Sequence, residues 1–281
     1  MNKKAIQLLL KQLKIIPSKK LGQNFIIDEN VLKKIISISN TSQNDVVLEI
    51  GPGLGALTQE LVELVNKVYA VEIDYRLWTY LNDKFSVYEN IEIIHGDILK
   101  IEIPPHNKVI SNIPYTITGP ILDKLFFIKN SPIGILTIEK NIADRIFLSS
   151  DYKNFSRISI SVNTFMNPIL RSNISRKSFY PIPQIALSLI KIIPKDKINA
   201  FLSEKSTIEF FLKFISGIMP YKNKNIANAI ALYFKTQEDI AYNKEEILNI
   251  LQKNDFENKK VFNFEIEEYI EISKLFCSFR T

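Results

Sequence analysis

The stretch from Glu49 to Thr58, with the sequence EIGPGLGALT, limits the possible folds of this chain more than any other. Three of the eight glycines in the sequence, Gly51, Gly53 and Gly55, lie within it. An apolar run at 46–50 precedes them, and leucines at helical spacing follow them. A strand that ends in a glycine turn before a helix lets a ligand approach the backbone, where a Cβ would collide. The stretch therefore predicts a nucleoside-binding half of a doubly wound α/β sheet.

Acidic residues stand at the ends of two further expected strands. Glu72 lies near the end of the apolar run 68–73, and Asp97 follows the run 91–94. An acid at the tip of the second strand can accept both hydroxyls of a ribose. The G-x-G-x-G spacing differs from the dinucleotide fingerprint, and no phosphate-loop lysine follows it. The glycines alone therefore leave the cofactor open, and they also allow a structural turn without a ligand.

Strands and helices continue to alternate beyond this unit, which predicts a parallel sheet with ligands at its carboxyl edge. The segment 157–166 is ambiguous, because its isoleucines and valine alternate as in a strand. After about residue 199 the apolar pattern becomes helical. We predict a sheet domain over 1–195, whose residues 1–27 form a basic segment, and a small helical domain over 196–281.

The sequence Asn112-Ile113-Pro114-Tyr115 follows the fourth expected strand. The Asn112 side-chain oxygen and the next backbone carbonyl can both accept from one exocyclic NH2 group. Pro114 fixes the turn without donating an N–H, and Tyr115 offers a face on which a base can stack. This arrangement suits methyl transfer from a sulfonium to an amine nitrogen. It leaves adenine, cytosine and glutamine acceptors open, and the alternative is a simple turn beside a core tyrosine.

Composition and charge narrow the class of protein. No apolar run approaches the roughly 18 residues of a membrane-spanning helix, so we expect no membrane insertion. The single cysteine, Cys277, fits a reducing compartment, and the cytoplasm is the expected location. The two histidines have no metal-binding spacing, so no metal is expected. Residues 1–27 hold six lysines and no acid, and 140–181 hold seven basic residues against two acids, which suggests a polyanionic partner or a solvated basic face.

Six motifs together resemble one known family, the KsgA-type ribosomal RNA adenine dimethyltransferases. They occur in that family's order over nearly the whole chain: GQNFIID (22–28), EIGPGLGALT (49–58), VEID (71–74), GDIL (96–99), NIPY (112–115) and FYPIP (179–183). The resemblance implies a Rossmann-like class I methyltransferase sheet with helices on both faces and a small all-helical C-terminal domain. It also implies a helix, instead of a strand, over 157–166. The implied cofactor is S-adenosylmethionine, with S-adenosylhomocysteine as product.

The resemblance also implies roles for individual residues. The N-terminal cover of the cofactor would be formed by Gln23, Asn24 and Phe25. The loop beneath its methionine part would be formed by Gly51, Gly53 and Gly55, and the ribose ligand would be Glu72. Ile73 would pack on the cofactor's adenine, which Asp97 and Ile98 would recognise. Asn112, Pro114 and Tyr115 would hold the target base, and Phe179 would form the second aromatic face of that clamp. Asn112 would also contact the cofactor. The alternative for Phe179 is a core aromatic before a proline-rich turn.

The function that the resemblance implies is dimethylation of N6 at two adjacent adenines near the 3′ end of small-subunit (16S) ribosomal RNA, as part of ribosome biogenesis. The expected partner is the RNA of the 30S precursor, bound by a monomer. Two alternatives stay open, a large-subunit (23S) methyltransferase that confers macrolide resistance and a noncatalytic RNA-binding assembly factor. The LGQNF opening and GPGLGALT are more like the small-subunit branch, which we therefore favour.

Overall fold

The computed structural model describes residues 3–147, 155–236 and 242–277. The chain divides into two compact units. The first comprises residues 1–126, 130–143 and 167–194, and the second comprises residues 127–129, 144–166 and 195–281. The division into separately folding domains at residue 195 stays a proposal. Residues 1–2 and 148–154 of its first part and residues 237–241 and 278–281 of its second part lie outside the described residues.

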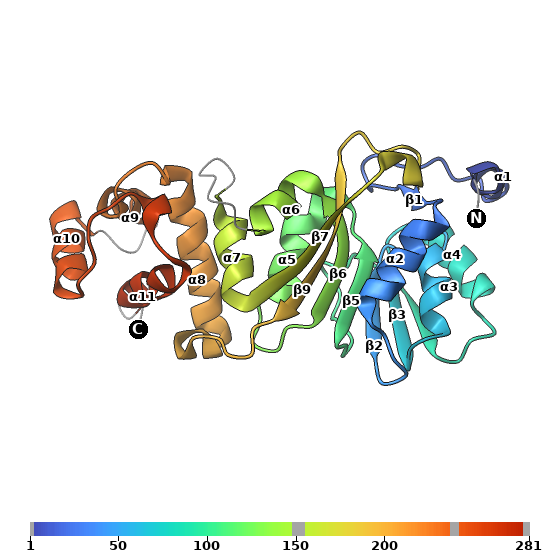
Figure 1. Ribbon diagram of the computed structural model, residues 1–281, viewed down its shortest axis with the longest axis horizontal. Coiled ribbons are helices and arrows are strands. Elements are labelled where there is room, and N and C mark those ends of the chain that lie inside the picture. The colour runs from blue at the N-terminus through green and yellow to red at the C-terminus, as the bar shows by residue number, and fades with distance from the viewer. Residues whose placement is uncertain (1–2, 148–154, 237–241, 278–281) are drawn as a thin grey trace. The chain divides into compact units, whose positions relative to one another are not determined.

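A seven-stranded sheet forms the centre of the first unit within its described residues (Figure 1). Its order is β4-β3-β2-β5-β6-β9-β7, and the five strands from β4 to β6 are parallel, whereas β9 is antiparallel to β6. A two-stranded sheet, β1-β8, is separate from it. The strands are β1 (Phe25–Ile26), β2 (Val46–Ile50), β3 (Lys67–Glu72), β4 (Ile91–His95), β5 (Lys108–Asn112), β6 (Ile133–Glu139), β7 (Met166–Ile174), β8 (Phe179–Tyr180) and β9 (Leu187–Pro194).

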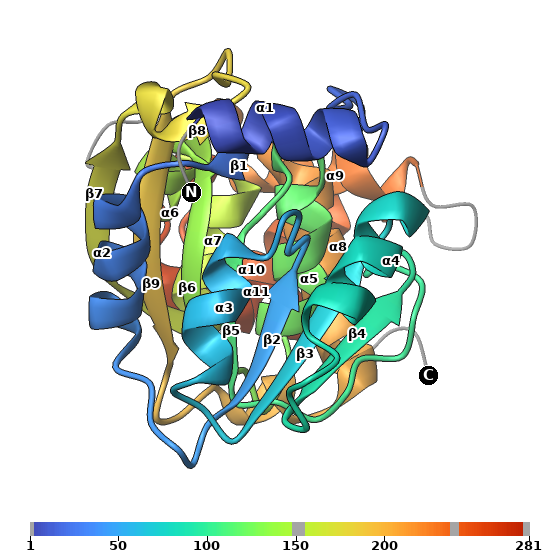
Figure 2. The same ribbon diagram turned by 90° about the vertical axis from the view of Figure 1, so that its right-hand side faces the viewer.

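Helices cover both faces of the large sheet. One buried cluster joins helices α2, α3 and α4 to strand residues such as Val47, Ile110 and Ile135. Gly134, the residue of β6 directly before Ile135, faces the other side of the sheet, since a Cβ there would lie 2.7 Å from the Phe126 ring of α5. Figure 2 shows α3 and α4 in front of the strands. The helices of this unit are α1 (Lys3–Gln12), α2 (Glu29–Ser39), α3 (Ala56–Val62), α4 (Tyr75–Lys84), η1 (Tyr115–Ile117), α5 (Thr118–Phe126), η3 (Arg176–Ser178) and most of α6 (Lys140–Ile146).

Helices make up most of the regular structure of the second unit within its described residues, together with an isolated bridge between Asn225 and Lys260. Its core is aromatic: the ring of Phe214 stacks on Phe276 and meets Tyr233 edge-on, and all three side chains are buried. A Cβ at Gly217 would lie 2.0 Å from Tyr233, so glycine permits the close approach of two helices there. The main helices are α7 (Arg157–Phe165), η4 (Ala200–Ser203), α8 (Lys205–Ile218), η5 (Met219–Tyr221), α9 (Ile226–Phe234), α10 (Lys244–Lys253), η6 (Val261–Asn263) and α11 (Ile266–Cys277). The predicted α/β sheet followed by a helical region is confirmed.

The ambiguous segment 157–166 is a helix up to Phe165, so the alternating pattern gave the wrong secondary structure and the family resemblance gave the right one. Ser156 and Ser159 explain why. The Ser156 backbone N–H donates to Ser159 Oγ at 3.1 Å, which stabilises the start of the helix. The apolar pattern misleads because this helix buries several polar residues as well, namely Ser159, Ser161 and Thr164.

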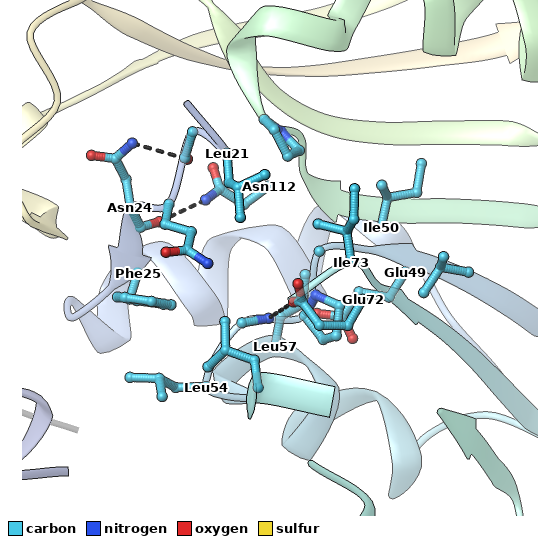
Figure 3. Close-up of a pocket in the computed structure, with 18 of the residues that line it drawn as sticks. Leu21, Asn24, Phe25, Glu49, Ile50, Leu54, Leu57, Glu72, Ile73 and Asn112 are labelled. Carbon is cyan, nitrogen blue, oxygen red and sulfur yellow. Dashed lines mark hydrogen bonds between the residues drawn. The ribbon is translucent and has the colours of Figure 1, made fainter. Parts of the chain in front are cut away.

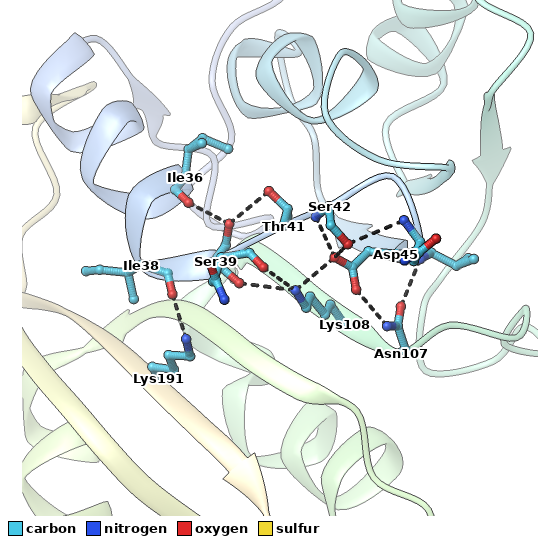
Figure 4. Close-up of polar contacts among 12 residues, drawn as sticks. Ile36, Ile38, Ser39, Thr41, Ser42, Asp45, Asn107, Lys108 and Lys191 are labelled. Carbon is cyan, nitrogen blue, oxygen red and sulfur yellow. Dashed lines mark hydrogen bonds and ion pairs between the residues drawn. The ribbon is translucent and has the colours of Figure 1, made fainter.

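A buried ion pair fixes the end of the sheet that lies opposite the glycine loop (Figure 4). Lys108, the first residue of β5, lies 2.9 Å from Asp45 Oδ2, and each side chain is only 8% exposed. The same ammonium donates to the carbonyl oxygens of Ser39 and Asn40 at the end of α2. Burial alone would raise the pKa of Asp45, but the bonds from Lys108 and Asn107 hold this pKa below its ordinary value. The pair therefore ties α2 to β5.

Replacing Lys108 by methionine is expected to lower the free energy of unfolding by about 3 to 5 kcal/mol, because a buried carboxylate loses its counter-ion. Denaturant titration measures this loss. The matched control is Lys191→Met, which should cost about 1 kcal/mol, since among the described residues Lys191 donates only to the Ile38 carbonyl, at 2.7 Å. Equal losses in the two variants would contradict a special role for the ion pair.

Candidate active site

A pocket opens at the carboxyl edge of the parallel strands, where the glycine loop, β3, β4 and β5 end (Figure 3). It encloses about 950 Å³, counted with the solvent space at its mouth. Most of the residues that the sequence singled out line it: Gln23, Asn24, Phe25, Gly51, Gly53, Glu72, Ile73, Asp97, Ile98, Asn112 and Pro114. Gly55, Tyr115 and Phe179 do not line it. Segments that are far apart in sequence thus converge on one cavity.

The glycine loop has a backbone that only glycine adopts without strain. Gly53 has a φ of +61°, and a Cβ there would lie 2.9 Å from the Phe25 ring. Gly55 serves packing, since a Cβ at this position would lie 2.7 Å from Phe85 beneath the loop. The loop therefore forms a tight floor between the pocket and the helix α3.

Glu72 links the glycine loop to β3. Its Oε2 accepts from the Gly53 N–H at 3.2 Å, and its Oε1 accepts from the Asp74 N–H at 2.9 Å. Burial raises the pKa of this carboxyl, although both backbone bonds oppose the rise. Beside it, Ile73 is 47% exposed whereas Ile98 is buried. A carboxylate with apolar side chains beside it suits a ligand that joins a sugar to a flat ring.

The segment before α2 forms a further wall of the pocket. Gln23 Nε2 donates to Asp74 Oδ2 at 3.1 Å, and the Asn24 carbonyl accepts from Asn112 Nδ2 at 3.0 Å. Phe25 packs with Ile6 of α1 and Leu54 of the glycine loop in a small buried cluster. Ile6 itself lines the pocket, which the sequence analysis missed. The four-residue spacing of Ile6 and Leu10 was the available signal for a helix packed at this place.

Asn112 ends β5 with its two side-chain atoms in different situations. Nδ2 is bonded to the Asn24 carbonyl, while Oδ1 is buried without a hydrogen-bond partner in the described structure. Tyr115 begins the short helix η1, and its buried hydroxyl also has no partner among the described residues. Burial raises the pKa of the Tyr115 hydroxyl, so it stays protonated at neutral pH. Among the described residues, Asn112 thus offers the pocket an unpaired acceptor, while the unpaired Tyr115 hydroxyl belongs to a residue outside the pocket lining.

Phe179 lies away from the pocket wall. It begins β8, pairs with Ile26 of β1, and has no exposed surface. It packs in the same cluster as Ile135, Leu187 and the half-buried Tyr115. This conformation matches the alternative that the sequence left open, a core aromatic, and the role of Phe179 at a base stays a proposal.

Comparison with known proteins places this chain in a family. The family model "Ribosomal RNA adenine dimethylase" matches residues 17–274. The chain belongs to this family. Five of the six sequence motifs, from the Gln23 segment to the one that holds Pro114, contribute residues to the pocket, and FYPIP (179–183) does not.

Curated relatives are similar in sequence over almost the whole length of this chain. The "Probable ribosomal RNA small subunit methyltransferase A" of Methanococcoides burtonii is 34% identical over 92% of this chain and 93% of its own length. The "Ribosomal RNA small subunit methyltransferase A" of Borrelia garinii is 33% identical over 96% and 92%.

Solved structures share the fold of this dimethylase. A dimethyladenosine transferase from Plasmodium falciparum has a TM-score of 0.73 at 24% identity, and the match covers 90% of this chain and 98% of that one. The 23S rRNA methyltransferase ErmE has a TM-score of 0.62 at 22% identity, with 89% and 98% covered. At these identities the likeness concerns the fold alone.

Within the described part of this dimethylase, no helix is long and apolar enough to cross a membrane. Nor do three or more His, Cys, Asp or Glu side chains of that part gather where they could hold a metal ion.

Two further charged residues of the dimethylase lie beneath its glycine loop. Glu49 is buried and accepts from Thr58 Oγ1 at 2.7 Å. Lys84 Nζ donates to the carbonyl oxygens of Leu54 and Gly55 at 3.1 and 3.2 Å, so it holds the loop from below. Burial raises the pKa of Glu49 to about 8, against the opposing effects of Thr58 and Lys84. Sequence analysis did not find Lys84, because it lies 29 positions beyond Gly55.

Glu49 is expected to make the fold less stable as the pH rises from about 5 to about 8, and Glu49→Gln should remove that contribution. Between its ordinary pKa of 4.5 and the raised value of about 8, Glu49 is ionised in the unfolded chain but protonated in the fold. Unfolding therefore releases a proton, so higher pH favours unfolding. Thermal melting of both cofactor-free proteins across this range measures the difference. Parallel pH profiles would contradict the raised pKa.

Proposed function

We propose that this chain transfers methyl groups from S-adenosylmethionine to N6 of two adjacent adenines near the 3′ end of small-subunit (16S) ribosomal RNA, giving N6,N6-dimethyladenosine. The observation that carries the proposal is that Asn112 lines the same pocket as Gly51, Glu72 and Asp97. The names of the curated relatives support the small subunit as substrate.

The residues of the pocket fit the cofactor. Glu72 would accept from the ribose hydroxyls, because its carboxylate stands at the tip of β3 beside the glycine loop. Ile73 and Ile98 would enclose the adenine ring, whose amino group Asp97 would recognise. Gln23, Asn24 and Phe25 would cover the cofactor, with Gly51 and Gly53 beneath its methionine part. S-adenosylmethionine, when bound there, supplies an electrophilic methyl group on its sulfonium, and S-adenosylhomocysteine is the product.

The chain's own contribution is positioning. Asn112 Oδ1, free of other partners in the described structure, would accept one N6 proton of the target adenine and hold the amino nitrogen in place. Pro114 keeps the turn rigid and donates no N–H. Tyr115, and Phe179 once displaced from the core, would stack on the base, which must leave its own stack to enter. No strongly basic group is required, because the N6 proton becomes acidic only as the new bond forms.

The target RNA belongs to the 30S precursor in this proposal, and the protein acts as a monomer in the cytoplasm during ribosome biogenesis. The basic N-terminal segment supports an RNA partner, because phosphate contacts need such charge.

The decisive experiment is labelled methyl transfer to isolated unmethylated 30S and 50S subunits, followed by digestion to nucleosides. The proposal predicts labelled N6,N6-dimethyladenosine from the 30S subunit only. Label in the 50S subunit would favour the large-subunit alternative. No label in either subunit, with RNA binding retained, would favour a noncatalytic assembly factor.

A further inference from the structure

The face of the large sheet that packs against α2 becomes polar where its strands reach the pocket. Side chains alternate between the two faces along a strand. On this face Val47, Ala70, Ile110 and Ile135 belong to one apolar cluster. The next residues on the same face, one per strand across β3, β2, β5 and β6, are all polar: Glu72, Glu49, Asn112 and Thr137. Asn112 and Thr137 are Cα partners, whereas Glu49 pairs with Ala70 and so lies one step short of Glu72. We refer to these four residues as the polar row.

The two halves of the polar row differ in their hydrogen bonds. Glu72 and Glu49 on β3 and β2 are satisfied by backbone N–H groups and by Thr58. Asn112 Oδ1 and Thr137 Oγ1 on β5 and β6 are buried and have no partner among the described residues. Thr137 has no exposed surface at all. Native proteins leave few buried polar atoms unpaired, so two in register point to an absent ligand.

Strand pairing sets Thr137 beside Asn112. The two residues are Cα partners in the parallel pair β5 and β6, and the Ile113 N–H donates to the Thr137 carbonyl at 3.1 Å. On its other side Thr137 pairs with Leu189 of β9, which shares the apolar cluster with Tyr115 and Phe179. The hydroxyl therefore stands on the side of Asn112 away from the glycine loop, on the face that both aromatic residues cover.

Adenine chemistry matches this order. The N6 amino group of adenine is flanked by two ring nitrogens, N1 and N7, which are acceptors. If Asn112 Oδ1 accepts from N6, a donor on the next strand faces one of those nitrogens. A threonine hydroxyl can donate to it.

We propose that Thr137 is a further substrate-binding residue, whose hydroxyl donates to a ring nitrogen of the target adenine beside the amino group held by Asn112. The base enters by displacing Tyr115 and Phe179 from the face of the sheet, which explains why Phe179 is buried without it. This inference rests on the proposed function and deepens it.

Thr137→Val tests the inference by removing the hydroxyl at almost unchanged volume. We expect kcat/KM for small-subunit RNA to fall about tenfold, which is the size of one lost hydrogen bond to substrate. Thr137→Ser keeps the hydroxyl and should stay within about twofold of the wild type. Cofactor affinity and the melting temperature should not fall, because the hydroxyl has no partner to lose among the described residues. Thr137→Ala provides the same comparison if Thr137→Val does not fold.

RNA analogues separate a contact with the base from an indirect effect. Small-subunit RNA carrying 7-deazaadenine or 1-deazaadenine at the target positions lacks one ring acceptor. One of the two should slow the wild type about as much as Thr137→Val does, and should slow that variant no further. Thr164→Val is the matched control, since Thr164 Oγ1 is buried and donates to the Ile160 carbonyl at 2.9 Å. It should lower stability and leave the analogue pattern unchanged.

Wild-type rates of methyl transfer by Thr137→Val would overturn the inference. So would a deazaadenine substitution that slows Thr137→Val as much as it slows the wild type. A fall in cofactor affinity with unchanged RNA kinetics would overturn it too. A wild-type protein that methylates no 30S RNA would instead overturn the proposed function, and the inference with it.

Discussion

Asn112→Ala is expected to reduce methyl transfer to small-subunit RNA at least about a hundredfold, because misplacing a reacting amino group costs that much. The Asn112 Oδ1 atom is the free acceptor at the end of β5, and alanine leaves no atom there to hold the target nitrogen. The fold should survive, since within the described structure the side chain makes one hydrogen bond, from Nδ2 to the Asn24 carbonyl. Labelled methyl transfer at saturating cofactor and RNA measures the loss, and thermal melting measures the fold.

Two comparisons make the Asn112 result specific. Asn82→Ala removes an exposed asparagine that donates to the Trp78 carbonyl within α4, and it should leave transfer unchanged. Cofactor affinity of Asn112→Ala should change much less than its rate, although the Asn24 segment loses one bond. Full activity of Asn112→Ala would refute the proposed role of the NIPY motif.

The strand tips of this site could be predicted because each has a local signal. Glu72, Asp97 and Asn112 each follow a short apolar run, and parallel strands present their carboxyl ends at one edge of a sheet. The structure brings all three to one pocket. The local sequence pattern was enough to predict these three site residues, because a parallel sheet brings the ends of its strands together at one edge.

Residues that act through distant partners could not be predicted in this way. Lys84 supports the glycine loop from the last turn of α4, and Ile6 reaches the pocket from α1. Thr137 is a candidate site residue only because strand pairing places it beside Asn112. The contacts of Lys84 and Thr137 leave no mark on the neighbouring sequence, since each depends on how separate elements pack. The helical spacing of Ile6 and Leu10 indicates a buried face but not what that face packs against.

Phe179 and the segment 144–166 are two further places where the local sequence does not determine the structure. An aromatic residue before a proline-rich turn is equally consistent with a base clamp and with a core position, and the structure buries it. Residues 144–166 belong to the helical unit, although they lie between sheet strands in the sequence. Alternating apolar residues there resembled a strand because the helix α7 also buries serine and threonine.

Glu72→Ala is expected to raise the dissociation constant of S-adenosylmethionine about ten- to a hundredfold, the size of hydrogen bonds to a charged group. The variant loses the acceptor at the tip of β3 and also releases the Gly53 N–H, which Glu72 holds at 3.2 Å. Calorimetry with cofactor and with S-adenosylhomocysteine measures the affinity. Methyl transfer at saturating cofactor should recover toward the wild-type rate, the reverse of the pattern expected for Asn112→Ala.

Titration gives Glu72 a second, independent readout. Burial raises the pKa of this carboxyl, and the ionised form is the one that accepts from ribose hydroxyls. Cofactor affinity of the wild type should therefore weaken as the pH falls through the raised pKa, whereas the affinity of Glu72→Ala should vary less. Glu60→Ala, on the exposed face of α3, is the control and should keep the wild-type profile. If Glu72→Ala bound cofactor with wild-type affinity, the ribose would have to be held elsewhere, and the assignment of this pocket to the cofactor would fail.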